Sequence, residues 1–273
     1  MSQTAFVRTK DFYIEKYTLK NPQAAMHYHP SNELYYILDG EREYFIENKF
    51  MKAVKGDFVF VPQNLLHRTD GKGATRILIY FSNDFLRRYF SDDIIAIIMS
   101  GFRPEVFRPG EETGKKLYSI ITKLLFEYTH SNAKGAKPDD ANFACLLFEL
   151  LYTISTSKNT FLEESFADSR INQIVGYINE NFRQITSLDE LAEKFYISKY
   201  HLCHIFSDYL GTQIIAYINM MKIREACRMI DTGKYKITEI SSACGFNSSS
   251  YFSKVFRKEM GMSPQEYRRQ RQI

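Results

Sequence analysis

Three histidines and one glutamate near the start of the chain have types and spacing that could support metal or ligand chemistry. His27 and His29 lie two residues apart, and Glu33 follows after three intervening residues. His67 comes later, at the end of the stretch GDFVFVPQNLLH (56–67). Imidazole nitrogens and carboxylate oxygens bind borderline divalent metals, and the same groups can hydrogen-bond a polar organic ligand.

The spacing of these residues predicts that their side chains share one face of a sheet. Side chains alternate along a strand, so His27 and His29 point the same way if their segment is extended. Tyr35 has the parity of Glu33 on the next predicted strand and therefore lies on the same face. The candidate binding residues are His27, His29, Glu33, Tyr35 and His67.

Residues 11 to 81 carry a strand pattern. ELYYIL, EYFIE, DFVFVP and TRILIYF are rich in β-branched and aromatic residues and are separated by turn-forming pairs. The expected turns are at Asp39-Gly40, Asn48-Lys49, Lys55-Gly56 and Asp70-Gly71. Many short strands at regular spacing predict a barrel or sandwich.

The middle of the chain has helical periodicity. LYSIITKLLFEY (117–128) and NFACLLFELLYTI (142–154) each place apolar residues on one stripe, and a polar loop separates them. We expect an antiparallel helix pair that packs beside the barrel and also forms a dimer interface. The polar stretch STSKNTFLEESFADS (155–169) is typical of a linker.

The last hundred residues contain an internal repeat. Residues 186–217 align with residues 236–267 at an offset of 49 before the central turn and 50 after it. Each copy has the pattern of a helix, a tight turn and a second helix, with Ser198 or Ser248 at the start of that helix and Gly211 or Gly261 at its end. Two helix-turn-helix units in register predict DNA binding, with each second helix in the major groove.

Charge and composition are compatible with this division of the chain. The 273 residues carry a net charge of +4, and all of that excess lies after residue 167, where 15 Lys and Arg face 11 Asp and Glu. The apolar runs are too short to span a bilayer, the N-terminus has no signal-peptide pattern, and the four cysteines form no CxxC pair. We expect a cytoplasmic protein with reduced thiols and no membrane partner.

The second repeat resembles the signature of the AraC/XylS family of transcription regulators. The matching residues are ISSACGFNSSSYFSKVFRKEMGMSPQEYRR (240–269), with the GF, the SYFSKVF and the G-x-SP-x-EYR in order. His204 departs from the family, which often has arginine at that position. By the resemblance, the DNA-contacting residues are Lys199, Tyr200, Cys203, His204, Ser249, Ser250, Ser253 and Lys254.

The N-terminal histidines resemble the two cupin motifs, HxH(x)3E(x)6G and G(x)5P(x)4H. In metal-binding cupins the residues matching His27, His29, Glu33 and His67 hold a divalent metal inside a small β-barrel. Asn64 stands where a glycine is usual, and Gly71 where an asparagine is usual. Three alternatives are open: a metal-free pocket for an organic ligand, a metal-occupied sensor, and a catalytic cupin.

Together these patterns predict an α+β protein with a cupin-like β-barrel, flanking helices and an all-α DNA-binding domain. The expected domains are an effector barrel (1–82), a helical dimerisation region (83–157), a linker (158–167) and two helix-turn-helix units (168–273). The predicted function is a sequence-specific transcription regulator, by resemblance an activator, whose barrel binds a small effector such as a sugar. We expect no enzymatic activity and no required cofactor, with a divalent metal as an option. The expected partners are double-stranded DNA, a second copy of the chain and RNA polymerase; the alternative is a metal-dependent cupin enzyme or metal sensor fused to a DNA-binding domain.

Overall fold

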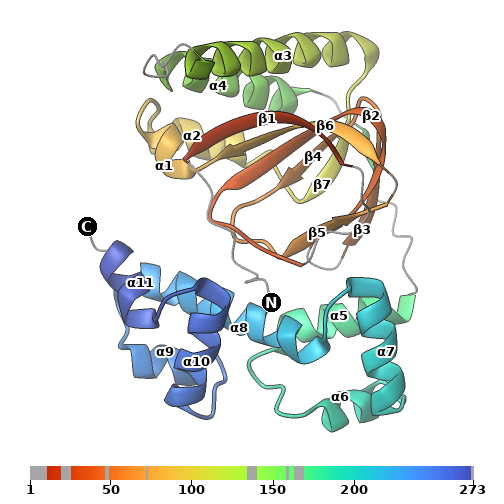
Figure 1. Ribbon diagram of the computed structural model, residues 1–273, viewed down its shortest axis with the longest axis vertical. Helices are drawn as coiled ribbons and strands as arrows, with labels where there is room; N and C mark the ends of the chain where they lie inside the picture. Colours follow the sequence, from red (N-terminus) through yellow and green to blue (C-terminus); the bar gives the residue numbers. More distant parts are fainter. Residues whose placement is uncertain are drawn as a thin grey trace.

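The computed structural model places a β-barrel between a layer of helices and an all-helical domain (Figure 1). It describes residues 11–19, 26–46, 49–71, 73–133, 140–157, 160–162 and 169–271. In Figure 1 the helices α3 and α4 cover one side of the barrel, and the C-terminal helices lie against its opposite end. The strand-rich first part and helical last part confirm the predicted α+β class.

The barrel is built on one long strand, β2, which pairs with four others. In the sheet the strands follow the order β1-β6-β2-β4-β7-β8, and β3 and β5 also pair with β2. All pairs between these strands are antiparallel. The strands are β1 (Phe12–Leu19), β2 (Asn32–Ile46), β3 (Lys49–Val54), β4 (Phe58–Val61), β5 (His67–Asp70), β6 (Ala74–Phe81), β7 (Glu105–Arg108) and β8 (Thr160–Leu162).

The predicted turn at Asp39-Gly40 is wrong. Strand β2 continues through both residues, and a shift in its pairing with β6 falls between Ile37 and Asp39. Gly40 has a φ of +82°, and a Cβ there would lie 2.6 Å from the carbonyl oxygen of Gly73. Glycine is therefore required here because a bulge brings two backbones close together, and not because the chain turns.

Two strands lie outside the predicted barrel boundaries. Strand β7 falls within 83–157, which was predicted helical, and β8 falls within 158–167, which was predicted to be a linker. The EVFR sequence of β7 is too short to show a strand period, but Val106 faces the barrel interior and Phe107 packs under the helices. Arg108 binds both carboxylate oxygens of buried Asp57 at 2.7 Å, which ties β7 to the start of β4.

Helices cover the outer face of the sheet and give the barrel a second apolar core. Phe58 and Phe60 of β4 point into this core, while Val59 and Val61 point into the barrel. Burial on both faces explains why FVFV is apolar throughout. The helices of this layer are α1 (Asn83–Arg87), α2 (Asp92–Met99), α3 (Glu111–Ala133) and α4 (Asp140–Thr156).

The C-terminal domain consists of two similar halves joined by a central helix, α8 (Figure 1). Each half contains a short helix followed by a longer one, as the sequence repeat predicts. The helices are α5 (Ser169–Asn181), α6 (Leu188–Lys194), α7 (Lys199–Leu210), α8 (Ile214–Asp231), α9 (Ile237–Ala243), α10 (Ser249–Met260) and α11 (Pro264–Arg271).

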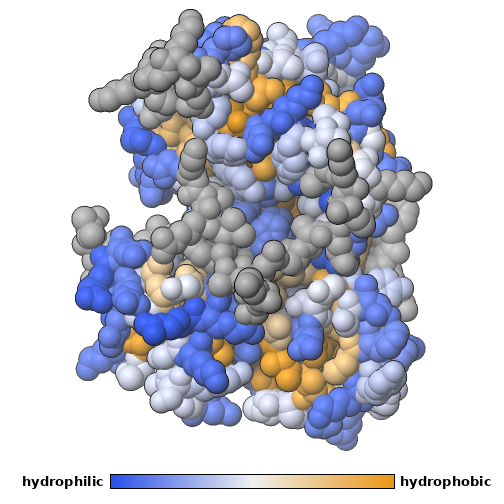
Figure 2. All heavy atoms as spheres, viewed as in Figure 1, coloured by the Kyte–Doolittle hydropathy of each residue, from blue (hydrophilic) through white to orange (hydrophobic). Residues whose placement is uncertain are grey.

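Figure 2 shows apolar surface on this face of both domains, bordered by hydrophilic side chains. Among the described residues, no helix combines the length and apolar character needed to cross a bilayer.

Candidate functional site

The histidines predicted from the sequence meet at one end of the barrel interior. The backbones of His27 and His67 hydrogen-bond to each other in both directions, at 3.0 and 2.9 Å. One ring nitrogen from each of His27, His29 and His67 lies within 4.8 Å of the others. His29 and His67 are almost fully buried, whereas His27 is partly exposed.

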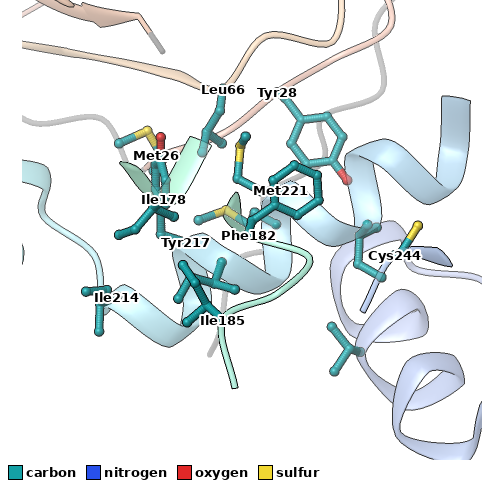
Figure 3. Packing of buried hydrophobic residues seen from close by; sticks show 14 of the residues in the cluster. Met26, Tyr28, Leu66, Ile178, Phe182, Ile185, Ile214, Tyr217, Met221 and Cys244 are labelled. Carbon is teal, nitrogen blue, oxygen red and sulfur yellow. The ribbon is translucent and has the colours of Figure 1, made fainter. Parts of the chain in front are cut away.

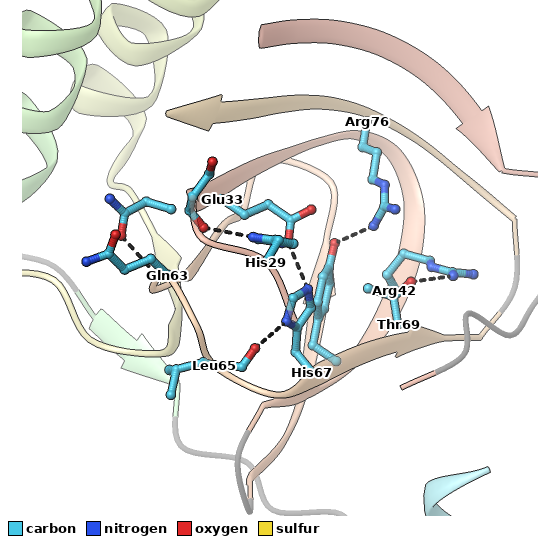
Figure 4. Close-up of polar contacts among 11 residues, drawn as sticks. His29, Glu33, Arg42, Gln63, Leu65, His67, Thr69 and Arg76 are labelled. Carbon is cyan, nitrogen blue, oxygen red and sulfur yellow. Dashed lines mark hydrogen bonds and ion pairs between the residues drawn. The ribbon is translucent and has the colours of Figure 1, made fainter. Parts of the chain in front are cut away.

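Glu33 completes this cluster at the start of β2 (Figure 4). Its Oε2 lies 3.3 Å from Nε2 of His29 and 3.0 Å from Nε2 of His67. Its Oε1 is buried and accepts no hydrogen bond from the part of the chain that the structure describes. Burial by itself raises the pKa of Glu33, but contact with the two imidazoles outweighs it and holds the pKa well below 4.5. The carboxylate is therefore charged at neutral pH.

The other ring nitrogens show which atoms face the glutamate. Nδ1 of His29 is 2.8 Å from the carbonyl oxygen of Ser31, and Nδ1 of His67 is 2.8 Å from that of Leu65. A carbonyl only accepts, so each Nδ1 carries the hydrogen and a neutral ring directs an Nε2 lone pair toward the carboxylate. Two lone pairs facing an anion are repulsive unless a proton or a metal cation lies between them.

This arrangement fits a divalent metal. Metal-binding histidines usually donate their second ring N–H to a carbonyl or carboxylate, which orients the ring, and His29 and His67 are oriented in this way. Three nitrogens and one carboxylate are a suitable ligand set for a borderline metal. Asn64 has a φ of +62°, so it adopts the left-handed conformation that the usual glycine would supply, and its N–H donates to the carbonyl oxygen of His29 at 2.7 Å.

Tyr35 lies on the interior face, as predicted, but farther along the barrel. It is 2% exposed, and its ring packs against the Tyr44 ring and under the Arg76 guanidinium. Sequence reasoning missed Arg76, although a single arginine in the apolar run TRILIYF was a signal for it.

The second helix of each helix-turn-helix unit begins and ends at the residues expected from the sequence. The Ser198 and Ser248 side chains accept hydrogen bonds at the N-termini of α7 and α10, and Gly211 and Gly261 end these helices in the left-handed conformation. The Ser187 side chain likewise caps α6. Each second helix is thus fixed at both ends by local interactions.

The predicted DNA-contacting residues lie on the two second helices, mostly exposed. Lys199 contacts Asp189 at 2.9 Å and His204 contacts Asp208 at 2.8 Å, so both side chains already have a carboxylate partner. Cys203 is half-buried and packs against the domain core, which leaves it the least accessible of the set. The contact of each residue with DNA stays a prediction; the remaining exposed members are Tyr200, Ser249, Ser250, Ser253 and Lys254.

The turns of the two units differ at one equivalent position. Gly245, in the second unit, has a φ of +76°, and Tyr196, 49 residues earlier, has a φ of +53°. A tyrosine rarely adopts this conformation, and this one is 96% exposed. The sequence repeat pairs the two positions, but only the backbone angle identifies Tyr196 as strained.

The chain neighbours of the barrel histidines contact the DNA-binding domain. Tyr28, between His27 and His29, donates a hydrogen bond from its hydroxyl to Sδ of Met260, the last residue of α10, at 3.0 Å. Arg68, next to His67, donates from Nη2 to the carbonyl oxygen of Tyr209, near the end of α7, at 2.6 Å.

Apolar residues extend this contact between the domains. Met26, Tyr28 and Leu66 reach from the barrel into the same core as Phe182 and Met221 of the helical domain (Figure 3). Side chains alternate along the barrel segments, so the histidines point inward and their neighbours point toward the recognition helices.

Family models match both halves of the chain. Residues 191–270 match a helix-turn-helix domain, and residues 17–81 match a cupin domain. The chain is an AraC-family transcription regulator with an N-terminal cupin domain. It follows that this regulator binds DNA under the control of an effector.

Curated relatives align with this regulator over most of their length. The transcriptional activator RhaS of Escherichia fergusonii is 24% identical over 256 residues, covering 92% of this chain and 90% of the relative. RhaS of Mannheimia succiniciproducens is 27% identical over 71% of this chain and 69% of the relative. The uncharacterised regulator YdiP of Escherichia coli is 23% identical, and the alignment covers 98% of this chain and 90% of YdiP.

Solved structures also align with this regulator, at low scores. ToxT from Vibrio cholerae covers 96% of this chain and 98% of its own, with 16% identity and a TM-score of 0.39. The alignment with the C-terminal domain of AraT from Geobacillus stearothermophilus covers 40% of this chain and 91% of that domain, with 29% identity and a TM-score of 0.39.

Proposed function

We propose that this regulator activates transcription from its target promoters when a small molecule occupies the barrel. Its relatives of the RhaS type are named as transcriptional activators, which supports the sign of regulation. The observation that carries the proposal is the double contact of Tyr28 and Arg68 with the ends of both second helices. DNA-facing residues are expected at the opposite, N-terminal ends of these helices.

The contacts supply a direct route from the barrel site to the DNA-reading helices. Tyr28 is flanked by two site histidines, and Arg68 is adjacent to the third. A ligand that draws these histidines together shifts the segments that hold Met260 and the Tyr209 carbonyl. Coupling of this kind requires only that the ligand binds one arrangement better than the other. These contacts favour this direct route over a longer one through the helices α3 and α4.

We further propose that His27, His29, Glu33 and His67 hold a divalent metal. The orientation of both Nδ1–H groups toward backbone carbonyls supports this, as does the unpartnered Glu33 Oε1. A bound metal would supply a Lewis acid that attracts the oxygen atoms of an effector. Elemental analysis of protein purified without chelators or a His tag should find about one metal equivalent, lost in His29→Ala and retained in the control His130→Ala. Wild-type protein with no bound metal contradicts this proposal.

We also propose that the chain acts as a homodimer and recruits RNA polymerase. The exposed side chains of Tyr118 and Phe126 on α3, and a groove of about 640 Å³ between α3 and β1, support a dimer interface on this layer. Sedimentation should show a dimer that Phe126→Glu weakens at least tenfold and that Arg87→Gln, an exposed control on α1, leaves unchanged. A dimer unaffected by Phe126→Glu would place the interface elsewhere.

The names of the relatives favour a cytoplasmic transcription regulator over a cupin enzyme. Two relatives that this chain covers for 90% of their length are named as transcription regulators. An enzyme would keep turnover of a small substrate when the two helix-turn-helix units are inactivated, whereas a regulator needs them.

Selection from random DNA tests the proposed function. The full chain should enrich duplexes with a defined motif read by two adjacent major-groove segments, about 10 base pairs apart. Binding should fall for Ser253→Ala and Lys254→Ala and stay constant for Arg87→Gln. Failure to enrich any motif, with the protein folded, would overturn the proposal.

A further inference from the structure

Arg76 on β6 is a buried cation inside the barrel. Its side chain is 5% exposed and lies between two aromatic rings, with its Cζ 4.8 Å from the centre of Tyr17 and 4.2 Å from that of Tyr35. Nη1 donates to the hydroxyl oxygen of Tyr44 at 3.2 Å (Figure 4), and Nε has no hydrogen-bond partner. Within the part of the chain that the structure describes, Arg76 makes no ion pair with a carboxylate.

Aromatic rings do not fully replace water around a guanidinium. A cation–π contact recovers only part of the free energy that is lost when an ion is moved out of water. Glu33 is the nearby buried acid, and its Oε2 already lies against His29 and His67. The Arg76 guanidinium therefore has more donors than the described residues supply acceptors for.

A second arginine adds to the positive charge of the interior. Arg42 is 1% exposed and shares the inward face of β2 with Tyr44. Its Nη2 donates to Oγ1 of Thr69 at 2.9 Å and its Nη1 to the carbonyl oxygen of Gly71 at 3.0 Å. Arg42 thus places a second buried guanidinium in the barrel interior.

The surrounding phenols are also donors. Burial raises the pKa of Tyr17 to about 12 and raises that of Tyr44 above its usual value, so both keep their hydroxyl hydrogen at neutral pH. Because the Tyr44 oxygen accepts from Arg76, its own hydrogen is left to donate. A guanidinium beside a phenol O–H is a donor set that matches the two oxygens of a carboxylate.

We infer that the barrel ligand is a small organic acid whose carboxylate binds Arg76 and Tyr44. This inference rests on the proposed function, because it takes the barrel as the effector site and names the chemical class of the effector. The acid group lies on the Arg76 side of the interior, and the rest of the ligand extends toward the histidine cluster (Figure 4). The sequence suggests a sugar only as an example of a small effector, and the effector inferred here is an organic acid instead.

Acetate and acetamide are matched probes, because they have nearly the same shape and differ in charge. The unfolding temperature of the full chain is measured against probe concentration at constant ionic strength, which gives an apparent Kd. Acetate should stabilise the wild type more than chloride does, and acetamide should not. Arg76→Gln should abolish the acetate effect, and Arg87→Gln should retain it.

Tyr44→Phe provides a second variant in case Arg76→Gln does not fold. It removes one hydroxyl, keeps the ring and should weaken acetate binding about tenfold, as expected for a hydrogen bond to a charged group. Equal stabilisation by acetate and acetamide, or an unchanged acetate effect in both Arg76→Gln and Tyr44→Phe, would overturn the inference. Affinity for a selected DNA duplex is measured on the same samples. If the wild type binds the duplex but does not respond to acetate, the organic-acid inference is wrong and the proposed function stands. If the wild type does not bind the duplex specifically, the proposed function is wrong.

Discussion

Gly245 should be the least replaceable residue in the turn of the second helix-turn-helix unit. Its φ of +76° disfavours a side chain, and an added Cβ would lie 2.0 Å from the carbonyl oxygen of Arg183. The Gly245 carbonyl is held in place by Lys222, whose Nζ donates to it at 2.7 Å. Lys222 is itself buried, at 7% exposure, so the Gly245 backbone cannot shift without disturbing a packed side chain.

The size of the effect follows from two separate terms. A left-handed conformation costs an alanine about 1–2 kcal/mol, and forcing extra volume into a packed site costs about 1–3 kcal/mol more. Gly245→Ala should therefore destabilise its unit by about 2–5 kcal/mol. Gly261→Ala is the matched control: its φ is +72°, and nothing lies within 4 Å of its added Cβ, so only the first term applies.

Hydrogen exchange of the α9 and α10 amides in the full chain measures the local stability. Gly245→Ala should speed exchange by about 5–150-fold beyond Gly261→Ala, since 1.4 kcal/mol corresponds to a factor of ten. Specific DNA binding should fall in parallel. Equal exchange in the two variants would refute the argument, because it would mean that the Arg183 backbone yields freely.

Three further predictions concern other parts of the chain. Tyr196→Gly should raise the free energy of unfolding by about 0.5–1 kcal/mol in urea titrations, because it relieves a left-handed tyrosine that is 96% exposed; a loss of stability would contradict this. Because the pKa of Glu33 in the folded protein lies well below 4.5, its charge stabilises the fold above pH 4.5, and this contribution is lost as the pH falls toward the folded pKa; the difference in stability between the wild type and Glu33→Gln, measured by urea titration, should shrink as the pH falls below 4.5, and a constant difference would contradict this. Lys254→Ala should weaken binding to a selected duplex more than to random DNA if Lys254 contacts a base, whereas equal losses would identify a phosphate contact.

Local signals made the DNA-binding domain predictable from the sequence. The serine caps and terminal glycines of α7 and α10 act within a few residues of their own positions, and the repeat displays them twice. The barrel histidines were also predictable, since two short motifs name them. Strands β7 and β8 were missed because four and three residues are too few to establish a period.

Contacts between distant segments could not be predicted. The environment of Arg76 is assembled from tyrosines on β1 and β2, so its burial appears only when the barrel closes. Tyr28 and Met260 are 232 residues apart, and Arg68 and Tyr209 are 141 apart. No pattern in one sequence indicates that these side chains meet.

The central claim is that the barrel site and the recognition helices are coupled through Tyr28 and Arg68. The most direct test measures how tightly four proteins bind one selected duplex. They are the wild type, Glu33→Gln, the double variant Tyr28→Phe/Arg68→Gln, and the triple variant that carries all three substitutions. Coupling of 1–3 kcal/mol predicts that Glu33→Gln changes DNA affinity by roughly 5–150-fold in the wild-type background, and much less once the two contacts are removed. An effect of Glu33→Gln that is the same in both backgrounds, or absent from both, would contradict the account.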